Sequence, residues 1–131
     1  MKVINKVSLG FLLLMGLAFA KVGFEALIDP QAVLANVGID LNNSSAHSSM
    51  RAVYGGMHLV FGLFCFWAAF KMQKEGLGLL VLYTLGFVLG RLSGVIVDGV
   101  PNAFVSQWLI TETISLVIAL FLFIKLRKQP A

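Results

Sequence analysis

Charged side chains are scarce in this chain, and their scarcity excludes an ordinary soluble domain. Only 12% of the 131 residues are charged, whereas a soluble domain carries about 25%. The mean hydropathy is correspondingly high, at +0.92. A chain with so few polar groups cannot cover a globule with them, so we expect lipid around most of its surface. The length fits a single membrane domain that comprises residues 1–131.

Cysteine and histidine are nearly absent as well, which excludes several kinds of site. The one cysteine, Cys65, can form no intramolecular disulfide, and we expect it to be a small buried residue. The two histidines, His47 and His58, are too few to complete a metal or haem site. The chain also lacks a glycine-rich phosphate loop and a Ser-His-Asp arrangement with credible spacing. We therefore assign no catalytic residue, metal or cofactor.

Four long apolar segments account for most of the chain: residues 8–28, 51–70, 77–97 and 104–124. Each has about 20 residues, the length that an α-helix needs to cross ~30 Å of hydrocarbon. This pattern predicts an all-α fold, an integral membrane four-helix bundle.

The first segment also resembles a secretory signal peptide. A short basic stretch precedes it, and Ala18-Phe19-Ala20 is similar to a signal-peptidase site. Apolar residues nevertheless continue as far as Ile28, which makes a full span. We therefore expect the segment to be retained as a membrane helix.

Lysine and arginine are missing from two of the connections, residues 29–50 and 98–103. Cations instead flank the opposite ends of the spans, at Lys2, Lys6, Lys71, Lys74, Lys125, Arg127 and Lys128. Because positive charge marks the cytoplasmic side of a span, we expect both termini and the 71–74 loop in the cytoplasm. We interpret these cations as topology anchors, and we expect no nucleic-acid partner.

The first outer loop, residues 29–50, contains a helix signal of its own. Asp29-Pro30 is typical of a helix start, and Gly38 is typical of a helix end. A short helix on the membrane surface is therefore predicted after Asp29. Residues 41–49 are rich in asparagine and serine and predict a loop.

Glycines recur on one face of two spans. Gly86, Gly90 and Gly94 are spaced by four residues in the third span, and Gly55 and Gly62 share a face of the second. Such rows allow two helix backbones to approach closely. We interpret them as packing seams within the bundle, although they could equally serve a homodimer.

Ionisable side chains from all four spans fall at nearly one level. At 1.5 Å per residue, each span carries one of them ~10–12 Å below its outer end: Lys21, His58, Arg91 and Glu112. Nearer to the outer surface are Glu25, Arg51, Tyr54 and Asp98. A charge that faces lipid costs at least a few kcal/mol, so we expect these groups to turn toward one another. We expect Arg91 and Glu112 to pair, because a guanidinium can bind a carboxylate through two hydrogen bonds.

Several short motifs carry a family resemblance: Asp29-Pro30, Arg51-Ala52-Val53-Tyr54-Gly55-Gly56, Gly90-Arg91, Asp98-Gly99-Val100-Pro101, and Glu112 in the last span. Together they resemble the small four-helix membrane proteins of bacteria catalogued as domain of unknown function 4345. The resemblance covers the chain from Leu9 to Leu126. It implies a multi-pass bundle in the bacterial inner (cytoplasmic) membrane and no assigned activity. It also marks Arg51, Tyr54, Arg91, Asp98 and Glu112 as pattern positions.

The polar level supports two main interpretations. The first is a cavity, open to the outer face, that binds an amphipathic lipid-like or quinone-like molecule. Its candidate ligand-binding residues are Lys21, Glu25, Arg51, Tyr54, His58, Arg91, Asp98 and Glu112. The second is a structural or assembly subunit, in which the charges order the helices and a homo-oligomer or membrane complex forms. A lipid-modifying enzyme that uses Glu112 or His58 as acid or base, and a transporter, are further alternatives. Membrane lipids are partners in every case.

Overall fold

The structure, a computed structural model, describes residues 2–130, and within them every regular element is a helix. The elements in order are α1 (Val3–Ile28), α2 (Pro30–Ala35), α3 (Ser44–Met50), the π-helix η1 (Arg51–Gly56), α4 (Met57–Lys71), α5 (Gln73–Asp98) and α6 (Ala103–Arg127). Met1 and Ala131, the two ends of the predicted domain, lie outside the described residues.

The four predicted spans are present as long apolar helices. α3, η1 and α4 follow one another without a break, so that Ser44–Lys71 forms one 28-residue helical segment. This segment, α1, α5 and α6 are each long and apolar enough to cross a membrane. The predicted all-α fold with four spans is therefore confirmed.

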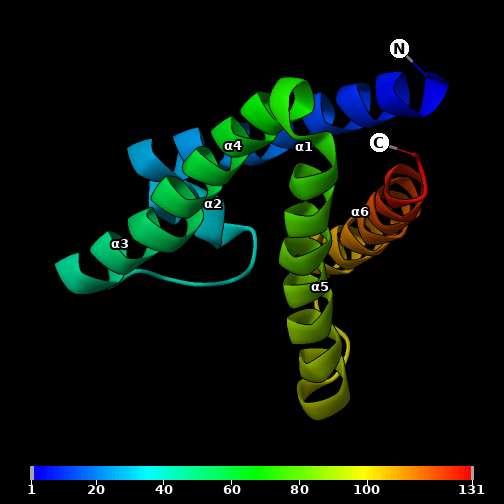
Figure 1. Ribbon diagram of the computed structural model, residues 1–131. Coiled ribbons are helices and arrows are strands. Elements are labelled where there is room, and N and C mark those ends of the chain that lie inside the picture. The colour runs from blue at the N-terminus through cyan, green and yellow to red at the C-terminus, as the bar shows by residue number, and fades with distance from the viewer. Residues whose placement is uncertain (1, 131) are drawn as a thin grey trace.

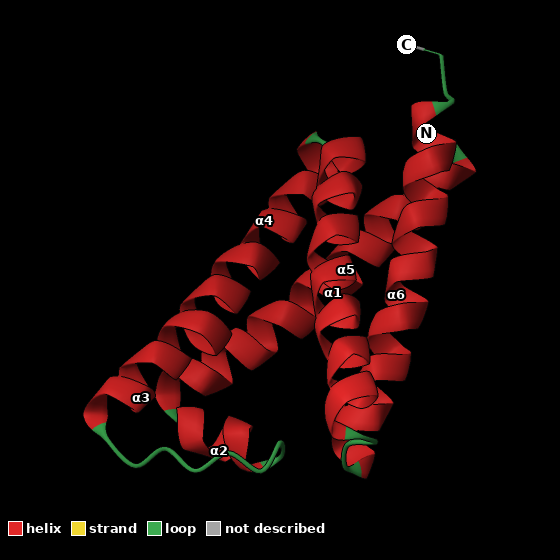
Figure 2. Ribbon diagram, turned by 90° about the horizontal axis from the view of Figure 1, so that it is seen from below, coloured by secondary structure: helices red, strands yellow, loops and turns green. Residues whose placement is uncertain are grey.

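The helices associate as two pairs that diverge from a shared end. α1 packs mainly on α4 and η1, whereas α5 packs mainly on α6. Figure 2 shows the two pairs splaying apart like a V, with both chain termini at one end and α2 at the other. We call the end with the termini and the Met72 turn the closed end, and the other end the open end. The chain turns sharply between α4 and α5, as Figure 1 shows. Met72 is the residue that joins these two helices.

The hydrophobic core lies at the closed end, where all four long helices meet. Its buried members come from α1, α4, α5 and α6: Leu12, Phe61, Cys65, Ala69, Leu77, Leu80, Ala119, Leu122 and Leu126. Cys65 is fully buried there, as predicted. Away from this end, most helix contacts lie within each pair.

The first connection confirms one prediction and corrects another. The predicted surface helix is α2, whose start is capped by the Asp29 side chain, which accepts a hydrogen bond of 3.1 Å from the Ala32 amide. The chain leaves this helix through Gly38, which adopts a positive φ of 76°. A positive φ favours glycine, because it has no Cβ to clash with the backbone.

The predicted loop over residues 41–49 is wrong from Ser44 onward, because α3 begins there and continues into the second span. The second span therefore begins before Arg51, and the first connection is shorter than the predicted 29–50. Asn43 caps α3 by accepting a 2.8 Å hydrogen bond from the Ala46 amide. Once the apolar helix that follows α3 has formed, each residue added to its N-terminal end forms a hydrogen bond without a second nucleation step. The serines of this segment, whose helix propensity is intermediate, therefore adopt the helical conformation as well.

Candidate functional site: a hollow between α4 and α5

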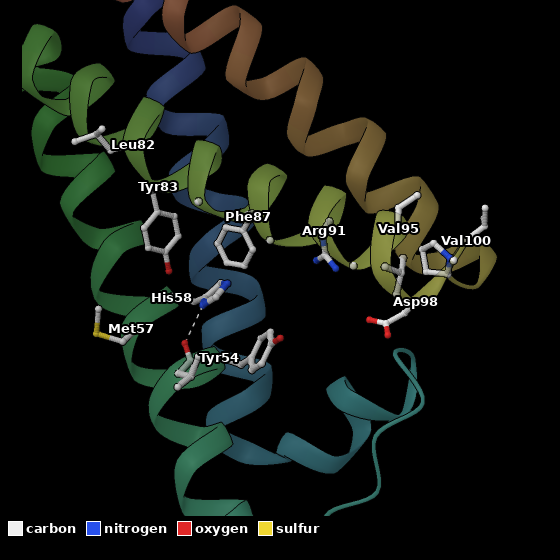
Figure 3. A pocket seen from close by; sticks show the side chains of 17 residues that line it. Tyr54, Met57, His58, Leu82, Tyr83, Phe87, Arg91, Val95, Asp98 and Val100 are labelled. Carbon is white, nitrogen blue, oxygen red and sulfur yellow. Dashed lines mark hydrogen bonds between the residues drawn. The ribbon is translucent and has the colours of Figure 1, made fainter.

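The space between the two diverging pairs contains a hollow of about 850 Å³. Its walls are the η1–α4 segment on one side and, on the other, the face of α5 from Leu82 to Asp98 with the connection that follows. Figure 3 shows Tyr83 and Phe87 on α5 directed toward Tyr54 and His58 of the opposite wall, with Arg91 further along α5. Four of the predicted site residues, Tyr54, His58, Arg91 and Asp98, therefore line one hollow.

The floor of the hollow on α5 is the row of glycines. Gly86, Gly90 and Gly94 line it, and a Cβ built on any of them would have no atom of the described chain within 4 Å. The other glycine row behaves in the opposite way. A Cβ on Gly62 would lie 2.6 Å from the Ala20 nitrogen, and one on Gly55 would lie 2.9 Å from Leu27. The expected packing seam thus exists between α1 and α4, whereas the α5 row faces open space.

Arg91 and Glu112 form a two-point contact between α5 and α6. The Arg91 Nε donates to Glu112 Oε2 at 2.6 Å, and Nη2 donates to Oε1 at 3.0 Å. The two side chains are only 23% and 13% exposed. This is the pair expected from the sequence. Arg91 also lines the hollow, and the carboxylate of Glu112 on α6 balances its charge. Glu112 itself is not part of the hollow's lining.

The mouth of the hollow carries a carboxylate and a link between two connections. Asp98, at the last turn of α5, lines the hollow and has no ion-pair partner within residues 2–130. In Figure 3 it points toward the connection that follows α2. Nearby, the Asn102 side chain donates a 3.1 Å hydrogen bond to the Asn36 carbonyl. This bond joins the α2 region to the α5–α6 connection across the open end.

His58 lies at the inner part of the hollow within a group of aromatic rings. Its Nδ1 lies 3.0 Å from the Val53 carbonyl oxygen, which belongs to the wider π-helical turn of η1. Its ring stacks on Tyr54, with centroids 5.6 Å apart and planes 21° apart. Tyr83, Phe87 and Phe19 approach the same ring at 5.6–6.0 Å. The ring is therefore held in one orientation by packing and by a hydrogen bond.

Besides Glu112, three more of the predicted site residues do not line the hollow. Arg51 extends to the end of α1, where its Nε donates to the Leu27 carbonyl at 3.1 Å and Nη2 donates to Ile28 at 3.4 Å. These are carbonyls at the negative end of the α1 dipole, so Arg51 acts as a cap for that helix. Lys21 and Glu25 pair with each other at 2.7 Å on the exposed face of α1. The expectation that these two turn inward is not met within this chain.

The two aromatic lining residues on α5 were absent from the predicted site. Phe87 and Tyr83 stand one and two helical turns before Arg91, on the same face of α5. Their four-residue spacing to Arg91 was a signal that could have found them. The positions of charged residues do not point to them, and aromatic residues in an apolar span usually face lipid or the core.

The described residues hold no group of three or more histidine, cysteine, aspartate or glutamate side chains placed to bind a metal ion. Four apolar helices of membrane-spanning length define a small multi-pass membrane protein. The chain belongs to the family described as domain of unknown function (DUF4345), whose model matches residues 7–123. The resemblance noted in the sequence is therefore confirmed. Neither the curated proteins nor the solved structures include a match to the chain.

Proposed function

We propose that the protein binds an amphipathic, lipid-like molecule in the hollow between α4 and α5, in the outer half of a bacterial inner membrane. The observation that carries the proposal is the combination of a hollow of about 850 Å³ with apolar residues along its length and charged residues near its mouth. Ligand sites of this size are mostly apolar and carry a few polar groups that orient the ligand.

The distribution of residues along α5 suggests how such a molecule would lie. Leu82, Phe87 and Met57 provide apolar surface on the side of the closed end. Arg91 and Asp98 stand nearer to the open end, so a polar head would lie there and a tail would run inward. The Arg91 guanidinium uses Nε and Nη2 for Glu112, which leaves its Nη1 hydrogens free for a head group.

The surroundings in a membrane support this proposal. A charged group that faces hydrocarbon is costly unless it is paired or lies in a polar cavity. Arg91 is neutralised by Glu112, but Asp98 has no such partner among the described residues. A head group with a hydrogen-bond donor would stabilise Asp98. The glycine floor leaves room for a ligand against the α5 backbone, because no side chain of the described residues fills it.

The experiment is a comparison of two glycine variants. Gly90→Leu places a side chain in the hollow, and Gly10→Leu makes the same change on α1 at a site that is equally free of neighbours. Each protein is purified in detergent, and bound lipid is quantified by mass spectrometry. We expect Gly90→Leu to lower the amount of bound ligand by about tenfold and Gly10→Leu to leave it unchanged. If the wild type carries no ligand, or if Gly90→Leu keeps it, the proposal is wrong.

A second candidate function is that of a structural or assembly subunit, and one observation favours it. The unpacked row of Gly86, Gly90 and Gly94 is also the kind of surface on which another transmembrane helix packs closely. In that case Gly90→Leu would change the oligomeric state rather than the lipid content. Light scattering of the detergent-purified wild type and of Gly90→Leu distinguishes the two: an oligomer that dissociates in the variant supports the subunit.

A further inference from the structure

The hydrogen bond of His58 determines what kind of group its ring can receive. The Val53 oxygen that lies 3.0 Å from Nδ1 is a carbonyl, which can only accept, so Nδ1 carries the hydrogen. In this tautomer of the neutral ring, Nε2 has a free lone pair and accepts a hydrogen bond. Within residues 2–130, Nε2 has no hydrogen-bond partner. His58 therefore offers an acceptor, and a group that binds to it must donate.

The residue that carries this acceptor is largely buried, and its exposed part faces the hollow. The residue is only 6% exposed, yet it lines the hollow. Figure 3 shows the second ring nitrogen of His58 on the side toward Phe87 and α5, away from the Val53 carbonyl. Among residues 2–130, Ser8 Oγ is the one fully buried side-chain nitrogen or oxygen atom without a hydrogen-bond partner, so Nε2 of His58 retains access to the hollow. A ligand in the hollow can therefore reach Nε2 and donate a hydrogen bond to it.

The surroundings of His58 suit a flat ring. Tyr54 stacks on the imidazole, and Phe87 and Tyr83 meet it edge-on, with interplanar angles of 68° and 73°. On the α5 side, Gly86 and Gly90 present bare backbone with free space above it. Aromatic rings prefer stacked or edge-on partners at such distances. A planar ring could enter here with little steric hindrance, whereas a bulky branched group would meet the aromatic walls.

We propose that the inner part of the hollow, formed by Tyr54, His58, Tyr83 and Phe87, binds a flat ring that carries a hydroxyl group, of the kind found in a substituted hydroquinone. The ring hydroxyl donates to His58 Nε2, and the ring lies against the aromatic side chains. This inference rests on the proposed function, since it names the chemical class of the molecule in the same hollow. It involves binding alone and no electron transfer.

A consequence is that the site distinguishes the reduced from the oxidised ring. A hydroquinone has O–H groups that donate to Nε2, whereas the corresponding quinone has only carbonyl oxygens, which accept. A quinone would place its carbonyl oxygen, which only accepts, next to Nε2, which also accepts. No hydrogen bond would form, and Nε2 would remain unpaired. We expect the reduced form to bind about tenfold more tightly than the oxidised form, which is the effect of one hydrogen bond made or lost in a buried site.

The experiment uses two probes, a decyl-substituted 1,4-hydroquinone and its matching quinone, added to the full-length protein in detergent micelles. Equilibrium dialysis gives the Kd of each form for the wild type and three variants. His58→Phe removes the acceptor while keeping a ring in place, and we expect it to reduce the tenfold ratio to about one. His58→Gln can place an amide oxygen near the Nε2 position, and we expect part of the preference to remain. His47→Phe makes the same change at the other histidine, outside the hollow, and should keep the full ratio.

The outcomes separate this inference from the proposed function. Equal affinity for the two forms in the wild type would overturn the inference, and so would a preference that survives in His58→Phe. Both results leave the lipid content of the wild type, and its loss in Gly90→Leu, as an independent test of the hollow. If Gly90→Leu binds both probes as the wild type does, the probes bind elsewhere, and this contradicts the inference and the proposed function together.

Discussion

The two helix pairs hold themselves together by different means. In the α1–α4 pair, glycines on both helices bring the backbones into contact, so that a Cβ on Gly16 would lie 2.9 Å from the Gly62 carbonyl oxygen. The open half of the α5–α6 pair contains instead the ion pair between Arg91 and Glu112. Gly86, Gly90 and Gly94 of α5 lie on a different face, toward the hollow.

This difference shows what a row of glycines does and does not predict. The spacing identifies a helix face that another group can approach closely. It does not say whether the neighbour is a helix of the same chain, a helix of another chain or a small molecule. In this protein, one row of glycines lies in the filled seam between α1 and α4, and the other lies on an open face of α5.

The largest expected effect comes from placing the same side chain in each row. Gly62→Leu would force a Cβ within 2.6 Å of the Ala20 nitrogen and the Gly16 oxygen, both of which are backbone atoms that cannot move aside cheaply. We expect it to lower the free energy of unfolding by about 3 kcal/mol. Denaturation in mixed detergent micelles, followed by circular dichroism, measures the loss.

Gly90→Leu is the matched control for that prediction. It has no described neighbour within 4 Å, and leucine is a better helix former than glycine by ~0.8 kcal/mol. The free energy of unfolding of this variant should be unchanged or slightly higher. If Gly90→Leu destabilises the protein as much as Gly62→Leu does, the α5 row is packed in the folded protein, and the contrast between the two rows disappears.

A smaller effect is expected from the ion pair of the second helix pair. Removing one partner, as in Arg91→Met or Glu112→Leu, leaves the other charge partly buried and unpaired. Fully buried pairs lose about 3–5 kcal/mol in this way, whereas interhelical hydrogen bonds in membranes average about 0.6 kcal/mol. With side chains 23% and 13% exposed, we expect a loss of about 2 kcal/mol for each single variant. The same denaturation experiment applies.

The double variant Arg91→Met with Glu112→Leu tests whether the two residues act as a unit. Apolar residues of similar size leave no unpaired charge, so the double variant should be more stable than either single variant. A double variant whose loss equals the sum of the two single losses would mean that Arg91 and Glu112 contribute independently. The ion pair would then not be what holds the open half of α5 to α6.

Much of the fold follows from the sequence because it depends on local, one-dimensional signals. The four spans follow from runs of apolar residues of the required length, and α2 follows from the Asp29-Pro30 start. The Arg91–Glu112 contact could be expected because both residues lie at one depth and each needs a partner. These inferences require only the rise of a helix and the cost of charge in hydrocarbon.

The remaining features depend on how helices are placed in three dimensions, which the sequence does not state. The splay of the two pairs, which turns the α5 glycines toward a hollow, follows from the sum of many weak contacts at the closed end. Arg51 could not be assigned to the end of α1 without knowing which helix lies beside it. The composition of residues 41–49 predicts a loop. The adjoining apolar helix instead continues through the segment from Ser44 onward, as α3.

The smallest expected effect concerns the second pair of opposite charges, Lys21 and Glu25. They lie one turn apart on the exposed face of α1, with side chains 68% and 49% exposed, and they share no contact with the hollow. An exposed pair at this spacing contributes about 0.3–0.5 kcal/mol. Replacing both with alanine should therefore change the free energy of unfolding in detergent by less than about 0.5 kcal/mol. A loss as large as that of Arg91→Met would contradict this expectation. It would indicate that the outer face of α1 is covered in the folded protein by a second copy of the chain, because in a single copy nothing among the described residues shields this pair.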